Sequence, residues 1–305
     1  MINKLPPALL LLLVFIASCI PGQEATPDAQ EGLPRVLAST SFLADITQNV
    51  AGNRLVVGSL LPPGVDPHAY QPRPADAAKI ASSSVLILNG AGYEHFMEPI
   101  LENAGGDPFV VDASAGLTPL PSGDDESSAV DPHFWLDPNL VITYVENIRD
   151  GLSTADPEGA ETYKANAEAY IKQLQELDIW IQSQVDTLGP EKRFLVTNHE
   201  ALGYFADRYG FTIVGAVIPS LSSEASPSAQ EMATLVQQIR SSNAMVIFLD
   251  AMDNPDLANQ IAKEARIKVI TDLYFESLTT PEGPAPTYID MMKHNTGIIV
   301  KGCKG

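Results

Sequence analysis

The sequence has few cysteines, few positive charges and few charged residues of any kind. Its 305 residues include two cysteines, which excludes a disulfide-rich scaffold and a zinc site built from several cysteines. Lysine and arginine number 18 against 38 aspartates and glutamates, so the net charge is −20. So acidic a surface repels nucleic acid and anionic membrane surfaces, and it attracts cations. Apolar residues, by contrast, make up 45% of the chain, which is enough for a globular protein of roughly two domains with a sizeable core.

The first 18 residues are predicted to form an export signal. One basic residue precedes an apolar run over residues 8–17, which is too short to span a bilayer as a helix. The run ends in Ile16-Ala17-Ser18-Cys19, which resembles the lipobox of bacterial lipoproteins, where cleavage before the cysteine is followed by its lipidation. The alternative is an ordinary secretory signal with a chance cysteine. We expect Cys19 to carry the lipid, with palmitate among its chains, and residues 19–33 to form a flexible tether.

Short β-branched runs alternate with helical patterns in each half of the remaining chain. This alternation predicts an α/β fold with a mostly parallel four-stranded sheet in each half and crossover helices between the strands. No later stretch is apolar enough to cross a membrane. The predicted strands are residues 36–38, 55–57, 85–88 and 109–111, then 194–196, 212–214, 245–248 and 268–270. The predicted helices are residues 42–50, 75–81, 201–209, 228–240 and 256–265.

One long helix is predicted between the two halves. Apolar side chains recur every three or four residues from Tyr163 to Leu188, in a stripe of about seven turns. Asp156-Pro157-Glu158 is typical of a helix start and Gly189-Pro190 of a helix end. A single helix of this length is a stiff connector. We therefore expect an N-terminal lobe over residues 34–150, a rigid linking helix within 151–189 and a C-terminal lobe over 190–305.

Three of the five histidines, His68, His133 and His199, lie in predicted loops that follow strands. In open α/β sheets, ligands gather in the crevice outside the carboxyl ends of the strands. Neutral imidazole is a good ligand for zinc and its neighbours in the periodic table. Each histidine alone is a weak signal, because a lone loop histidine is more often a surface residue. Their separations of 65 and 66 residues mean that only the fold could bring them together.

Four motifs together resemble the metal-binding receptors of bacterial ABC importers for zinc and manganese, the cluster A-I or family-9 solute-binding proteins. The motifs are residues 61–72, 131–138, 198–205 and 270–273, and the resemblance extends over nearly the whole chain from Arg35. It implies two (β/α) lobes joined by one long rigid helix, with the metal buried in the cleft between them. Carried over to this sequence, it implies four metal ligands: His68, His133, His199 and Asp272.

The third ligand position separates the subgroups of this family. Manganese-preferring members resemble one another in carrying glutamate there and zinc-preferring members in carrying histidine, and this sequence has His199. Three imidazoles and one carboxylate suit tetrahedral zinc, whereas manganese prefers more oxygen ligands. The resemblance therefore implies Zn2+ as the bound ion. Mn2+ or iron remains an alternative, because a short acidic loop, residues 121–130, replaces the histidine-rich loop of many zinc receptors.

Together these features predict a receptor that delivers a metal ion to an ABC permease and its ATPase. We expect a monomer that is anchored by its lipid to the extracellular or periplasmic side of the cell membrane, and that is not an enzyme. A zinc hydrolase with Glu200 as its base is one alternative, although the sequence has no HExxH motif and Asp272 would fill the fourth position on the metal. An adhesin is the other. Metal binding should displace protons from the histidines, so affinity should fall below about pH 6.5.

Overall fold

The computed structural model describes residues 32–101, 103–120 and 130–305. The predicted signal segment, Cys19 and the tether up to residue 31 lie outside these residues, as does most of the acidic loop. Within the three described ranges, none of the helices has both the length and the apolar character that crossing a membrane requires.

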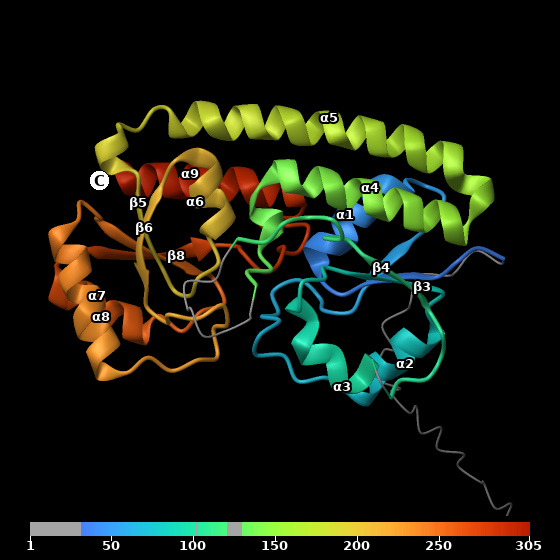
Figure 1. The fold of residues 1–305 in the computed structure, drawn as a ribbon, viewed down its shortest axis with the longest axis horizontal. Helices are drawn as coiled ribbons and strands as arrows, with labels where there is room; N and C mark the ends of the chain where they lie inside the picture. The colour runs from blue at the N-terminus through green and yellow to red at the C-terminus, as the bar shows by residue number, and fades with distance from the viewer. Residues whose placement is uncertain (1–31, 102, 121–129) are drawn as a thin grey trace, which may run out of the picture.

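Two four-stranded parallel sheets form the two lobes (Figure 1). The strand orders are β2-β1-β3-β4 and β6-β5-β7-β8, so both lobes have the same topology. In each sheet the second strand in sequence lies on one side of the first, and the third and fourth strands lie on its other side. This confirms the predicted fold class, and every predicted strand is present within three residues of its expected bounds. The strands are β1 Val36–Ala38, β2 Val57–Ser59, β3 Val85–Leu88, β4 Phe109–Asp112, β5 Phe194–Thr197, β6 Thr212–Ala216, β7 Val246–Asp250 and β8 Lys268–Leu273.

Helices connect the strands and cover the sheets. The predicted helices are present, and two further long ones, α4 and α9, pack with the linking helix along one side of the molecule. The α-helices are α1 Ser41–Ala51, α2 Pro74–Ser82, α3 Glu98–Leu101, α4 Pro138–Ala155, α5 Ala160–Val185, α6 Gly203–Tyr209, α7 Ala229–Ser241, α8 Asp256–Ala265 and α9 Tyr288–Lys304. Short 3-10 turns are η1 Tyr93–Met97, η2 Phe134–Leu136, η3 Pro157–Gly159 and η4 Pro190–Lys192.

Helix α5 is the predicted connector, and it runs across both lobes (Figure 1). It packs on α4 and α1 of the first lobe and on α9 of the second. The side chains of its predicted apolar stripe are buried, from Tyr163 to Val185. The stripe belongs to a single hydrophobic cluster that also contains Phe42 from the first lobe and Met291 from the second. Because the two lobes share this core, a wide hinge opening would expose apolar surface and is unfavourable.

Candidate metal centre

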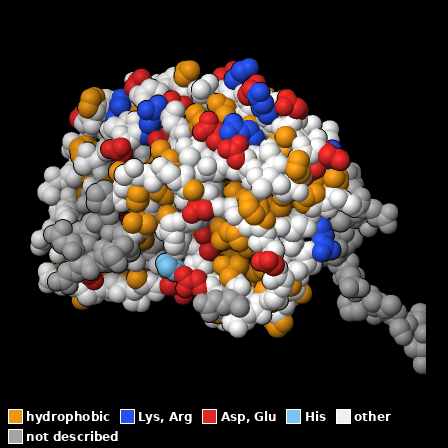
Figure 2. Space-filling view, turned by 45° about the vertical axis from the view of Figure 1, so that its right-hand side comes forward, with side chains coloured by type: hydrophobic (Ala, Val, Ile, Leu, Met, Phe, Trp, Pro, Cys, Tyr) orange, Lys and Arg blue, Asp and Glu red, His pale blue; other side chains and the backbone are white. Residues whose placement is uncertain are grey.

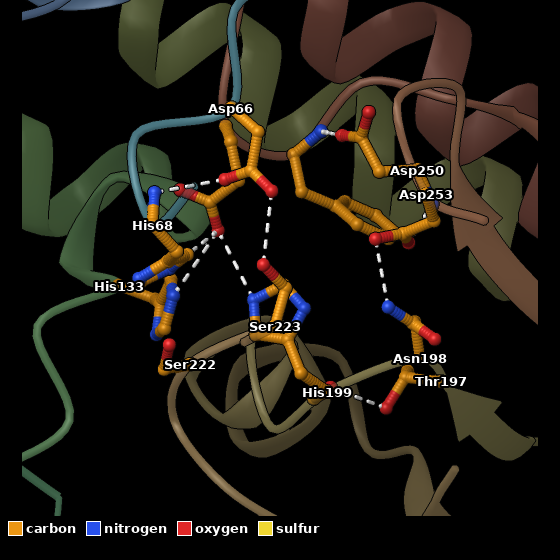
Figure 3. Close-up of polar contacts among 12 residues, drawn as sticks. Asp66, His68, His133, Thr197, Asn198, His199, Ser222, Ser223, Asp250 and Asp253 are labelled. Carbon is orange, nitrogen blue, oxygen red and sulfur yellow. Dashed lines mark hydrogen bonds and ion pairs between the residues drawn. The ribbon is translucent and has the colours of Figure 1, made fainter. Parts of the chain in front are cut away.

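Four side chains converge at the edge where the strands of both lobes end. His68 lies in the loop after β2, His133 immediately before η2, His199 just after β5, and Glu276 beyond β8. One potential ligand atom from each lies within 4.8 Å of the other three. His133, His199 and Glu276 are fully buried, and the side chain of His68 is 12% exposed. Figure 3 shows the three imidazoles facing one another from the two lobes.

The spacing of these atoms is that of a coordination shell. Glu276 Oε1 lies 3.1 Å from His133 Nε2, 3.3 Å from His199 Nε2 and 3.9 Å from His68 Nε2. Ligands held at about 2.0–2.1 Å from a tetrahedral zinc ion are about 3.3 Å apart, so the first two distances fit such an ion directly. The longest distance belongs to His68, which is the ligand candidate on the partly exposed loop.

Asp131 sets the orientation of the His133 ring. Its Oδ1 accepts hydrogen bonds from His133 Nδ1, at 2.7 Å, and from the His133 backbone N–H, at 3.0 Å. With its proton on Nδ1, a neutral imidazole presents the lone pair of Nε2 to the cluster, which is how metal-binding histidines are commonly held.

Two nitrogens in the cluster have unmet bonding capacity. When His133 is neutral and carries its proton on Nδ1, Nε2 of His68 and Nε2 of His133 are both buried without a hydrogen bond to the described part of the chain. Leaving buried polar atoms without a hydrogen bond is costly in a folded protein. A cation at the centre of the cluster would satisfy both atoms, so the four residues fit a divalent metal.

The charges of the cluster depend strongly on burial and proximity. Burial lowers the pKa of His133, but Glu276 and Asp131 outweigh burial and raise that pKa to about 10. Burial raises the pKa of Glu276, but the imidazoles, His133 first among them, hold it well below its usual value. Burial lowers the pKa of His68. Without metal, therefore, a protonated His133 neutralises the Glu276 carboxylate, while His68 is uncharged at neutral pH.

The backbone before Glu276 is anchored from both lobes. The Phe275 N–H donates to the Asp250 carboxylate, and the Phe275 carbonyl accepts a hydrogen bond from Trp135 Nε1 at 2.7 Å. The Asn295 side chain bonds both the N–H and the carbonyl of Tyr274. Since these contacts fix the backbone of Tyr274 and Phe275, the carboxylate of Glu276, the next residue, is delivered to the cluster in a defined position.

The structure does not bring Asp272 into this group, and Glu276 takes the place expected for it. Strand β8 continues to Leu273, so Asp272 lies inside the strand and not beyond its end. Its side chain is 61% exposed, and its carbonyl oxygen accepts a hydrogen bond from His294 Nε2 at 2.7 Å. Glu276 is the first acidic residue past the true end of β8, so a correct strand boundary would have pointed to it.

A contact between the lobes lies beside His68. Asp66 Oδ1 accepts a hydrogen bond from the His68 backbone N–H at 2.9 Å, and Asp66 Oδ2 accepts one from the Ser223 hydroxyl, also at 2.9 Å (Figure 3). Ser223 lies in the loop between β6 and α7 of the second lobe. Asp66 therefore ties the His68 loop to the opposite lobe.

Charged side chains are unevenly distributed on the face of the molecule shown in Figure 2. Lysine and arginine lie mostly at the top, together with acidic side chains, whereas acidic side chains lie lower down, beside the histidine that is visible there. This distribution favours the approach of cations, and salt should weaken it.

The fold and the cluster define a class of protein: two-lobed ligand-binding proteins whose ligand sits between rigidly connected lobes. Residues 36–302 match the family described as zinc-uptake complex component A, periplasmic, and the chain belongs to this family.

Similar proteins are named for several metals. The manganese-binding lipoprotein MntA of Halalkalibacterium halodurans is 35% identical over 96% of both chains, and the iron-binding protein YfeA of Yersinia pestis is 34% identical over 88% of this chain and 86% of that protein. A manganese-bound periplasmic metal-binding protein from Candidatus Liberibacter asiaticus superposes with a TM-score of 0.80 at 31% identity, covering 88% of this chain and 99% of that one. The periplasmic zinc-binding protein TroA of Treponema pallidum gives a TM-score of 0.82 at 26% identity, covering 89% and 99%.

Proposed function

We propose that the protein is an extracytoplasmic receptor that captures one divalent transition metal, preferably Zn2+, and delivers it to an ABC permease and its ATPase. The observation that carries this proposal is the buried group of His68, His133, His199 and Glu276 between the lobes. Family membership over residues 36–302 supports the receptor role, because the family is described as a component of zinc uptake.

The choice of zinc rests on the donor set. Three imidazole nitrogens and one carboxylate oxygen match the four-coordinate preference of zinc, and manganese favours sites richer in oxygen. Exchanging the predicted Asp272 for Glu276 leaves this composition unchanged. The relatives named for manganese and iron make these two ions the alternative cargoes.

The enzyme alternative is weaker than the receptor. Catalytic zinc keeps three protein ligands and leaves a position for water. In this cluster a fourth protein donor, Glu276 Oε1, already lies within 3.3 Å of two imidazole nitrogens. We therefore retain the receptor and not the hydrolase.

The anchoring of the protein remains a proposal from sequence. We propose that residues 1–18 are removed, that Cys19 is lipidated, and that residues 19–33 tether the lobes of residues 34–150 and 190–305, with their linking segment 151–189, outside the cytoplasm as a monomer. Metabolic labelling with a radioactive fatty acid should mark the wild type and leave Cys19→Ala unlabelled. Equal labelling of both would contradict the anchor.

The metal proposal is tested by competition with a coloured chelator, using residues 20–305. We expect one tightly bound Zn2+ per chain, which Mn2+ in excess does not displace. His133→Ala should lose this binding, whereas His95→Ala should keep it, because the His95 side chain is 77% exposed and pairs with Glu98. Tighter binding of Mn2+ than of Zn2+ would make manganese the cargo, and equal binding by both variants would contradict the site.

A further inference from the structure

We propose that Tyr93 is a positioning residue that restricts Glu276 to one metal-binding oxygen and so favours zinc over manganese. This inference rests on the proposed function, since it concerns the coordination of the captured ion. It adds a residue from the first lobe that does not itself ligate the metal.

The two oxygens of Glu276 have different partners. Oε1 faces the three imidazoles, at 3.1 Å from His133 Nε2 and 3.3 Å from His199 Nε2. Oε2 accepts a hydrogen bond of 2.6 Å from the Tyr93 hydroxyl. Tyr93 and Glu276 are both buried, so water does not compete for this bond. A hydrogen bond to a charged acceptor is among the stronger ones in proteins.

The ring of Tyr93 has little freedom to move. It packs edge-on against Trp135, with ring centroids 4.9 Å apart, and against His68 at 5.8 Å. The turn before it, Gly90-Ala91-Gly92, has positive φ at all three residues, including 51° at Ala91, where a side chain makes this conformation costly.

The next residue along the chain fixes this turn. The Glu94 carboxylate is buried and accepts hydrogen bonds from the backbone N–H groups of Asn89 and Gly90 and from the Ser39 hydroxyl. The hydroxyl of Tyr93 is therefore presented to Glu276 by a rigid segment.

A carboxylate can bind a metal through one oxygen or through both. Binding through both raises the coordination number, which suits manganese, whereas tetrahedral zinc needs one oxygen from this residue. To bind through both oxygens, Glu276 would have to rotate so that Oε2 also faces the ion, which moves Oε2 from its position 2.6 Å from the Tyr93 hydroxyl. This rotation weakens a buried hydrogen bond, so the hydrogen bond opposes the higher coordination number.

The test compares Tyr93→Phe with Tyr163→Phe in residues 20–305. Tyr163 is a matched control, because it is also buried and also donates its hydroxyl to a carboxylate, that of Asp156 at the junction of α4 and α5. Zn2+ and Mn2+ dissociation constants are measured by chelator competition. X-ray absorption at the zinc edge gives the number of ligands.

We expect wild type and Tyr163→Phe to hold zinc with four ligands, one of them a single carboxylate oxygen. Tyr93→Phe should hold zinc with five ligands, and its preference for zinc over manganese should fall by at least about tenfold, the factor that loss of one charge-assisted hydrogen bond produces.

An unchanged ligand number and metal preference in Tyr93→Phe would overturn the role of Tyr93. Two carboxylate oxygens on zinc in the wild type would overturn it as well, without recourse to any variant. Failure of the wild type to bind either metal would instead overturn the proposed function on which the inference rests.

Discussion

Binding of Zn2+ at pH 7.5 should release close to one proton per metal ion. The proton comes from His133, whose pKa Glu276 and Asp131 raise to about 10 against the opposing effect of burial. A histidine of ordinary pKa, about 6.5, would be about one-tenth protonated at pH 7.5 and would release almost nothing. His68, whose pKa burial lowers, and the ionised Glu276 add no proton at this pH.

The affinity for Zn2+ should rise with pH, because the metal ion and a proton compete for His133. Because the metal displaces a proton, the observed affinity should rise by about tenfold per pH unit between pH 7 and 9, and level off above about pH 10. The sequence-based expectation, a loss of affinity only below about pH 6.5, treats every histidine as unperturbed. Because Glu276 and Asp131 raise the pKa of His133, the affinity should already depend on pH well above pH 6.5.

The assay is calorimetry of Zn2+ binding at pH 7.5 in buffers with different heats of ionisation. The slope of the measured heat against buffer ionisation heat gives the number of protons released. Asp131→Asn should lower this number, because it removes one of the two charges that support the protonated form. A wild-type release of about one-tenth of a proton, the value for an ordinary histidine, would refute the reasoning.

Two further predictions concern the contact between the lobes and the linking helix. Ser223→Ala removes the hydrogen bond to Asp66, so chelator-triggered metal release in a stopped-flow experiment should become about fivefold to tenfold faster. Ser222→Ala in the same loop is the control, and equal rates in the two variants would contradict the role of Ser223. Leu174→Ala in the buried stripe of α5 should lower the free energy of unfolding by about 2–5 kcal/mol in one cooperative urea transition, and a separate transition for each lobe would argue against a shared core.

Local sequence patterns were sufficient for most of the fold. The β-branched runs predicted the eight strands found in the described part of the chain, because a strand in a doubly covered parallel sheet is a short apolar run. Helix α4 was not predicted although its signals are present: Asp137 caps it, Pro138 is its first residue, and the apolar residues Val141, Val145 and Ile148 share its buried face. Asp137 and Pro138 are also the last residues of the motif over residues 131–138, so the motif accounts for the same signals as the start of the helix.

The site was predictable only in part. The three histidines lie beside clear strand ends, and the fold brings them together as expected. The fourth member of the group, Glu276, lies four residues beyond Asp272, the residue that the resemblance implied. Strand β8 is longer than its β-branched core, so the pattern does not show where the strand stops. The Tyr93–Glu276 hydrogen bond joins residues 183 positions apart, and only the packing of the two lobes reveals it.

Native mass spectrometry of residues 20–305 tests the central claim most directly. The claim is that one metal ion is held by His68, His133, His199 and Glu276 together. Equimolar Zn2+ and Mn2+ are offered to the wild type, Glu276→Ala and Asp272→Ala. We predict one zinc ion on the wild type and on Asp272→Ala, and its loss from Glu276→Ala. Retention of the ion by Glu276→Ala together with its loss from Asp272→Ala would contradict the claim.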